Sequence, residues 1–134
     1  MQWSDGINGG FTEGNPWIQV NENTCFINAE TELQDPDSVF IFYKKLIRLR
    51  KEYDIIAYGD FEPKAEKHLS IFAYKRYYRG KELLVINNFY GNQVCWDAGE
   101  DLEPYECLLG NYKKQDINGT EVILKPYETM ILYK

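Results

Sequence analysis

Histidine and serine are scarce in this sequence, and their scarcity limits the chemistry that it can support. His68 is the single histidine among the 134 residues, and the serines are Ser4, Ser38 and Ser70. Nucleophilic catalysis by a serine or cysteine needs a base within hydrogen-bond reach, which is usually a histidine. Because His68 follows the charged run KAEK, we expect it in a solvated turn and not in a catalytic site.

Cysteines are also few, and they are widely separated. The three are Cys25, Cys95 and Cys107, with no C-x-x-C pair. An odd number of cysteines with a single histidine argues against a structural zinc site and against a disulfide framework. We therefore predict three free, buried thiols in a reducing compartment and no metal site.

Long apolar runs, nucleotide-binding motifs and an excess of positive charge are missing as well. No apolar run approaches the roughly 20 residues of a membrane span, and no secretory leader pattern opens the sequence, so we expect a cytoplasmic protein without a membrane partner. Neither G-x-G-x-x-G nor G-x-x-x-x-G-K-[ST] occurs, so no cofactor is expected. The net charge of −6 disfavours nucleic acid as a partner.

Aromatic residues, in contrast, are abundant. They make up 16% of the chain and include 11 tyrosines, a composition that favours sheets with broad packed faces. The chain opens with MQWSDGINGGFTEGNPWIQVN, in which two tryptophans and a phenylalanine lie among turn-forming residues without a helical or strand period. Because so long an irregular stretch is uncommon within a compact domain, we expect residues 1–34 to belong to a larger structure.

The segment DPDSVFIFYKKLIRLRKEYD predicts a helix over residues 35–54. Asp35 is suited to cap its N-terminus and Pro36 to occupy its first helical position. Its broad apolar face includes Phe40, Tyr43 and Ile47. If that face lacks a cover, we expect copies of the chain to associate through it.

From residue 55 onward, short apolar runs alternate with turn signals. About eight runs predict antiparallel strands: IIAYG, DFEP, HLSIFAYKRYY, ELLVINNF, QVCWD, YECLLG, EVILK and ETMILYK. Turns are predicted at Arg79-Gly80, Gly91-Asn92 and Asn118-Gly119. The spacing predicts a mainly β fold, a two-layer β-sandwich over residues 55–134.

The acidic residues do not form an evident catalytic pair. Asp35 and Asp37 fall at the predicted helix start, and Glu100, Asp101 and Glu103 fall in a polar loop. A glycosidase needs two carboxyl groups that face each other across a cleft. We interpret these five residues as caps and solubilising groups, and we identify no catalytic residue.

The three tryptophans raise the question of a sugar-binding platform. Trp96 follows Cys95 in an alternating strand and is expected in the core. For Trp3 and Trp17, packing within a larger structure and exposure as sugar platforms are equally supported by the sequence.

Several segments, taken in order, resemble a known family. MQWSDG, GFTEGNPWIQVN, INAE, DPDSVFIFYKKLIRLRKEYD and AYGDF, followed by IFAYKR, ELLVINNF and LKPYETMILYK, resemble the C-terminal third of oligo-1,6-glucosidases in the α-amylase superfamily (glycoside hydrolase family 13). Trehalose-6-phosphate hydrolases and dextran glucosidases share the pattern. The resemblance extends over the whole chain.

The resemblance implies a division of the chain. Residues 1–54 would be a remnant of the catalytic (β/α)8 barrel, with a loop over 1–34 and the last barrel helix over 35–54. Residues 55–134 would form a Greek-key β-sandwich of the α-amylase C-terminal type. The barrel of the parent enzyme would be the partner of this chain.

The resemblance also bears on the site. The family's catalytic aspartate, glutamate and second aspartate lie on barrel strands that precede the matched region, so no catalytic residue is carried over. Gln2 and Trp3 lie nearest to the family's substrate site in sequence, and we predict that they contact substrate.

Two functions remain open on the sequence alone. The chain could be the C-terminal part of an exo-acting α-glucosidase, inactive by itself and stabilising in the intact enzyme. It could instead be a free-standing carbohydrate-binding or interaction module. The linkage preference of a parent enzyme is not fixed by the sequence.

Overall fold

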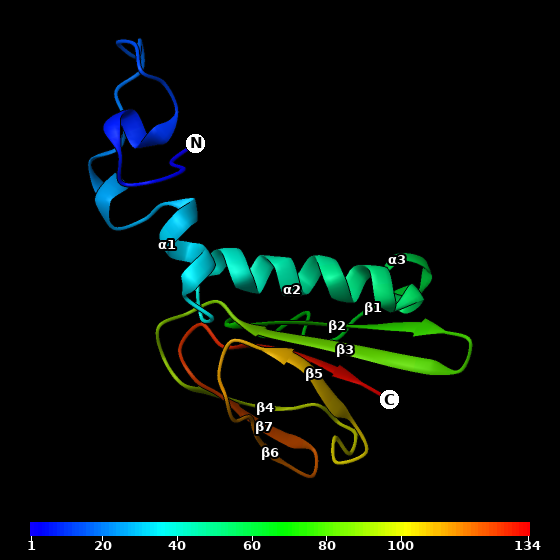
Figure 1. Ribbon diagram of the computed structural model, residues 1–134. Coiled ribbons are helices and arrows are strands. Elements are labelled where there is room, and N and C mark those ends of the chain that lie inside the picture. The colour runs from blue at the N-terminus through cyan, green and yellow to red at the C-terminus, as the bar shows by residue number, and fades with distance from the viewer. The chain divides into compact units, whose positions relative to one another are not determined.

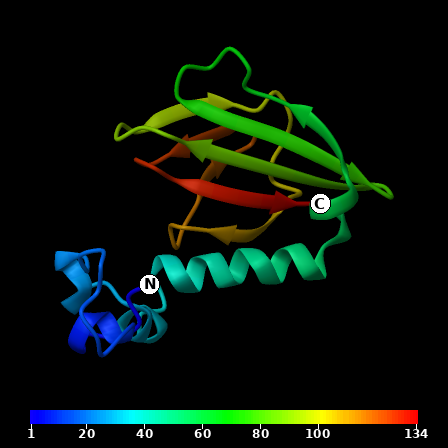
Figure 2. The same cartoon turned by 90° about the horizontal axis from the view of Figure 1, so that it is seen from above.

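The computed structural model describes residues 1–134. These residues form two compact units, Met1–Ile47 and Arg48–Lys134. The boundary between the units falls within the long helix α2 (Val39–Glu52). Figures 1 and 2 show the helical and looped N-terminal unit and the strand-rich C-terminal unit. Each unit is described by itself.

The N-terminal unit is built from short helices and loops tied together by backbone hydrogen bonds. Two 3-10 turns, Ile7–Gly10 and Glu22–Cys25, precede the helix α1 (Ala29–Gln34). Two backbone hydrogen bonds join the first residues to the first 3-10 turn and to α1. Trp3 N donates to Gly9 O (2.7 Å), and Glu30 N donates to Trp3 O (3.0 Å). The first residues are therefore held in place although they carry no regular element.

A reciprocal cap starts α1. Asn28, which is buried, accepts a hydrogen bond from Thr31 N at its Oδ1 (2.9 Å), and the Thr31 hydroxyl accepts one from Asn28 N (3.3 Å). Such a capping box satisfies backbone donors that a short helix otherwise leaves free. The predicted loop over residues 1–34 thus contains a helix at its end.

Helix α2 begins at Val39, later than the predicted start at Asp35. The Asp35 carboxylate accepts a hydrogen bond from Asp37 N (2.9 Å), which closes a turn before the helix. Ser38 is the residue whose hydroxyl accepts from the first helical turn, at Ile41 N (3.2 Å). The side chains of Asp35 and Ser38 are both able to cap a helix N-terminus. Because the Asp35 carboxylate is bonded within the preceding turn, Ser38 provides the cap of α2.

The run IIAYG is helical, so the prediction of a strand there is wrong. It forms helix α3 (Asp54–Tyr58), with Asp54 in the first turn, where its negative charge interacts favourably with the helix dipole. Ile55 is buried and packs with Leu83 and Val85 of the sheet. This packing outweighs the strand preference of two adjacent isoleucines.

The C-terminal unit is the predicted antiparallel β-sandwich, and that prediction is confirmed. The strands of its five-stranded sheet, in spatial order, are β1 (Asp60–Pro63), β2 (Ile71–Tyr78), β3 (Lys81–Asn88), β8 (Thr129–Tyr133) and β5 (Glu106–Gly110). The strands of the three-stranded sheet are β4 (Val94–Asp97), β7 (Glu121–Leu124) and β6 (Asp116–Asn118). All pairings are antiparallel, and β6 lies outside the eight runs that were predicted to form strands.

The main core lies between the two sheets. Its buried members come from both layers and include Ile71, Leu84, Ile86, Val122, Leu124, Met130 and Leu132. Trp96 is partly buried and packs against this cluster, as predicted. The alternation of β2 and β8 therefore points one set of side chains inward, between the sheets.

The hairpin between β2 and β3 turns at Arg79 and Gly80, as the sequence predicts. Their φ angles are +50° and +76°, so both residues adopt the left-handed conformation. Two-residue hairpin loops favour this geometry because it matches the twist of the strands. An arginine at the first position carries a modest conformational cost.

The cysteines are free, as predicted, but they are not all buried. Cys25 and Cys95 are exposed, and Cys107 is half-buried. Burial of the Cys107 thiol raises its pKa. Cys95 lies on β4 between inward-facing neighbours, so strand alternation turns it to the surface.

Candidate functional site

A hollow in the N-terminal unit combines aromatic rings with side-chain amides. Its volume is about 550 Å³, and its lining includes Gln2, Asn8, Phe11, Asn15 and Trp17. The Trp17 side chain is 95% exposed and Phe11 is 66% exposed. Flat rings beside amide donors and acceptors form a surface suited to neutral polar molecules such as sugars.

Of the two predicted substrate contacts, the structure brings Gln2 to this hollow and leaves Trp3 outside its lining. The Gln2 amide nitrogen donates to Asn23 Oδ1 (3.0 Å) and to Ile27 O (2.7 Å). Both amide hydrogens are thereby used within the loops, so only the amide oxygen is left for a ligand. The Trp3 ring is about half exposed.

Asn8 organises the wall of the hollow, and the sequence analysis missed it. Its side-chain nitrogen donates to Thr12 O (2.9 Å) and Gly14 O (2.8 Å), so it closes the loop that carries Phe11. Its φ angle is +54°. The signal was present in the run INGG, because asparagine tolerates the left-handed conformation better than most residues.

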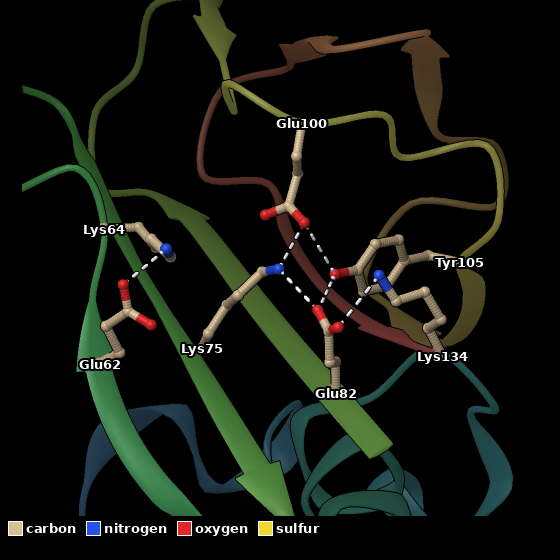
Figure 3. A network of polar contacts seen from close by, with 7 residues as sticks. All are labelled: Glu62, Lys64, Lys75, Glu82, Glu100, Tyr105 and Lys134. Atoms are coloured by element: carbon tan, nitrogen blue, oxygen red, sulfur yellow. Dashed lines mark hydrogen bonds and ion pairs between the residues drawn. The ribbon is translucent and has the colours of Figure 1, made fainter. Parts of the chain in front are cut away.

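The C-terminal unit carries a polar network around Lys75 (Figure 3). The Lys75 side chain is 3% exposed, and its Nζ lies 2.8 Å from Glu82 Oε2 and 2.5 Å from Glu100 Oε2. The Tyr105 hydroxyl lies 2.7 Å and 3.2 Å from the same two oxygens. Lys134 Nζ lies 3.2 Å from Glu82 Oε1. A separate pair joins Lys64 and Glu62 at 2.7 Å.

Lys75 and Glu82 keep their charges at neutral pH. The hydrogen bond from Lys75 lowers the pKa of Glu82 to about 2, against the opposing effect of burial, and Tyr105 and Lys134 add to the lowering. Burial acts to lower the pKa of Lys75, but its bonds with Glu100, Glu82 and Tyr105 outweigh burial and raise that pKa. Burial, first of all, raises the pKa of Tyr105.

These charges do not make a glycosidase pair. Hydrolysis of a glycosidic bond needs one carboxyl group that is protonated at the working pH. Glu82 is held ionised, and a lysine lies between it and Glu100. The arrangement is that of a structural ion-pair network, and it corrects the expectation that Glu100 only solubilises a loop.

Asp101 and His68 serve local turns. The Asp101 carboxylate accepts a hydrogen bond from Glu103 N (3.1 Å). His68 Nδ1 accepts from Ser70 N (3.2 Å) and Ile71 N (3.0 Å), which places the histidine in the turn before β2, as predicted. No three histidine, cysteine, aspartate or glutamate side chains gather closely enough to hold a metal ion. None of the helices has the length and apolar character needed to cross a membrane.

Comparison with known families divides the chain into two matches. Residues 1–59 match the family described as "Alpha amylase, catalytic domain". Residues 71–131 match the family described as "Alpha-amylase SusG C-terminal domain". The N-terminal part of the chain is thus similar to an α-amylase catalytic domain, and its β-sandwich is similar to an α-amylase C-terminal domain.

Comparison with individual proteins gives a more specific similarity than the two family matches. The chain is 43% identical to the oligo-1,6-glucosidase of Halalkalibacterium halodurans and 43% identical to the trehalose-6-phosphate hydrolase of Bacillus subtilis, with 98% of the chain and 24% of each relative covered. The crystal structure of Bacillus licheniformis trehalose-6-phosphate hydrolase superimposes with a TM-score of 0.90 at 41% identity, again over 98% of the chain and 24% of that protein. The chain therefore spans about a quarter of the length of these relatives. Over its length it is similar to the C-terminal quarter of oligo-1,6-glucosidases and trehalose-6-phosphate hydrolases.

Proposed function

We propose that this chain functions as the C-terminal portion of an α-glucosidase that hydrolyses terminal α-glucosidic bonds of short oligosaccharides of the isomaltose type. The observation that supports the proposal most strongly is the continuous match to oligo-1,6-glucosidases over 98% of the chain. Trehalose 6-phosphate is the second candidate substrate, because a trehalose-6-phosphate hydrolase is equally similar.

In this proposal, residues 1–54 complete the catalytic barrel and residues 55–134 form the C-terminal domain. Two separate family matches, over residues 1–59 and 71–131, support a division of the chain into two parts, with the first match reaching five residues beyond the proposed boundary. Gln2, through its amide oxygen, and Trp3, through its half-exposed ring, are the proposed substrate contacts.

The chain by itself is proposed to be inactive, with a stabilising role in the complete enzyme. The clustered acids Glu82 and Glu100 are engaged by Lys75, and no other carboxyl pair stands out as a proton donor and nucleophile. The free thiols fit a reducing compartment, and we propose a cytoplasmic location.

The alternative of a free-standing carbohydrate-binding module is less well supported. Such a module would need only the β-sandwich. The first 59 residues, however, match a catalytic domain, and two of their aromatic residues, Phe11 and Trp17, line one hollow and are 66% and 95% exposed. Large apolar side chains that stay exposed beside each other indicate a missing partner.

An exchange enzyme tests the proposal. The C-terminal quarter of the Halalkalibacterium halodurans oligo-1,6-glucosidase is replaced by this chain, and hydrolysis of isomaltose is measured. We expect an active enzyme, because the replaced segment and this chain are 43% identical. In the exchange enzyme, Gln2→Ala and Trp3→Ala should raise KM, with Asp5→Ala as the exposed control. An exchange enzyme that folds no better than the relative truncated at the same point would contradict the proposal.

A further inference from the structure

The outer face of the five-stranded sheet already carries residues of the catalytic-domain match. That match ends at residue 59 and includes α3, whose Ile55 packs on Leu83 and Val85 of β3. Just before α3, the Tyr53 ring meets the Tyr133 ring of β8 edge to face, with 5.1 Å between centroids. One part of this face is therefore covered by the end of the catalytic-domain segment.

Arg76 shows which side chains share that face. Arg76 Nε donates to Ile55 O (3.0 Å) and Nη2 donates to Gly59 O (2.6 Å), so Arg76 points toward α3. Side chains two residues apart in a strand lie on the same face. Tyr74 and Phe72 of β2 thus lie on the same face as α3.

Next to α3, this face bears an uncovered aromatic strip, defined as Phe61, Phe72, Tyr74 and Phe89. The centroid distances are 5.1 Å for Phe61–Tyr74, 5.7 Å for Phe72–Tyr74 and 6.2 Å for Phe72–Phe89. The three phenylalanines are 56%, 48% and 64% exposed. Contiguous aromatic side chains that stay this exposed on a sheet mark an interaction surface.

We infer that the aromatic strip is the surface on which the C-terminal sandwich docks against the body of the catalytic domain. The inference rests on the proposed function. It is supported by continuity, because α3 is part of the catalytic-domain match and occupies the same face. It is also supported by length, because about three quarters of the length of each matched relative lies outside the region that this chain covers.

The chain offers a matched pair of thiol positions for a test. Phe72→Cys places a thiol on the strip, and the native Cys95 is an exposed thiol on β4 of the other sheet. The 134-residue chain and the exchange enzyme described above are both treated with an alkylating reagent, and modification at each position is followed by peptide mass spectrometry. In the chain alone, both thiols should react at similar rates. In the exchange enzyme, the thiol introduced at position 72 should react at least tenfold more slowly, while Cys95 keeps its rate.

The outcomes separate the inference from the function on which it rests. If the exchange enzyme hydrolyses isomaltose but the thiol from Phe72→Cys reacts as fast as in the chain alone, the inference is wrong and the proposed function stands. If the exchange enzyme without Phe72→Cys is inactive and misfolded, the proposed function is wrong, and the inference that rests on it is wrong as well. Should Phe72→Cys itself prevent folding, Phe61→Cys provides the same measurement on β1.

Two other occupants are outcomes of the same experiment. Slower reaction in the chain alone when isomaltooligosaccharide is added would assign the strip to a sugar ligand. Slower reaction in the chain alone as its concentration rises would assign the strip to a second copy. Either result would overturn docking to the catalytic domain.

Discussion

At the scale of single residues, Lys75 is the side chain whose environment differs most from its usual one. It occupies an inward position of β2, after Ile71 and Ala73, and is almost fully buried. Its charge is balanced by Glu82 and Glu100. Breaking a buried ion pair by removing one partner is costly, because the remaining charges lose their compensation.

We therefore expect Lys75→Met to lower the free energy of unfolding by about 2–4 kcal/mol, since two carboxylates would be left facing each other. The measurement is urea denaturation followed by circular dichroism. The double variant Lys75→Met/Glu82→Gln should recover part of the loss. A single variant as stable as the wild type would show that the network contributes nothing to stability.

Glu82 predicts an acid-dependent loss of stability. Its pKa is lowered from 4.5 to about 2 in the folded chain, so its stabilising contribution is complete above pH 4.5 and is lost as the pH falls from 4.5 to 2. We expect about 1–3 kcal/mol of the free energy of unfolding to disappear over this range. In Glu82→Gln the decline should be shallower by that amount, whereas Glu103→Gln, an exposed loop change, should follow the wild type. Equal slopes in all three proteins would argue against the lowered pKa.

At the scale of elements, Gly59 controls how closely α3 approaches the sheet. A Cβ at this position would lie 2.6 Å from Ile55 O and 3.2 Å from the Arg76 Cβ. We expect Gly59→Ala to cost about 1–3 kcal/mol, because the backbone at the end of α3 must shift to relieve the contact with Ile55 O, and Arg76 of β2 limits the space for that shift. Gly14→Ala is the control, since its nearest neighbour, Thr12 Oγ1, lies at an ordinary 3.6 Å. Thermal melts of the two variants provide the measurement, and equal melting temperatures would contradict the close approach.

The elements also show what the sequence could and could not predict. The strands β2, β3, β7 and β8 were found from alternation, turn residues and continuous apolar runs, which are local signals. Helix α3 was missed because its stability comes from Ile55 on β3, a contact that no local pattern records. Resemblance to a family supplied the interpretation of residues 1–54 as part of a catalytic barrel and the choice of Gln2 and Trp3.

The polar network was missed for a related reason. Lys75 stands where the alternation predicts an inward apolar residue, and its partners Glu82, Glu100 and Tyr105 are spread over distant positions of the chain. Sequence reasoning assigned Glu100 to a polar loop, which is true of its backbone. Only the fold brings its carboxylate to a buried lysine.

At the scale of the whole molecule, activity should depend on protein outside these 134 residues. We expect the chain alone to hydrolyse neither isomaltose nor an aryl α-glucoside above the buffer rate, because glycoside hydrolysis needs a protonated carboxyl beside a nucleophilic or basic one. Mixing the chain with a barrel segment of the relative that stops before the matched region should restore some turnover. Hydrolysis by the chain alone that is abolished by changing one of its own acids would refute this expectation.

The exposed apolar face of α2 predicts self-association of the isolated chain. Phe40, Tyr43 and Ile47 are 43%, 63% and 45% exposed. Because burying such side chains is worth on the order of 1.5–3 kcal/mol each, copies should associate through this face. Light scattering should show a mass that rises with concentration, and Tyr43→Lys/Ile47→Lys should shift it toward the monomer. A wild-type chain that stays monomeric at all concentrations would contradict the prediction.

The strand order has a consequence for synthesis on the ribosome. Strand β8, which ends at Tyr133, pairs with β3 on one side and with β5 on the other, so a strand made after both of its partners lies between them in the five-stranded sheet. Until it leaves the exit tunnel, the inner side chains of β3 have no neighbour on that side, and the hydrophobic core stays open. The nascent sandwich must therefore wait for residues 129–133, and this interval is when it is most exposed to misfolding and to chaperones.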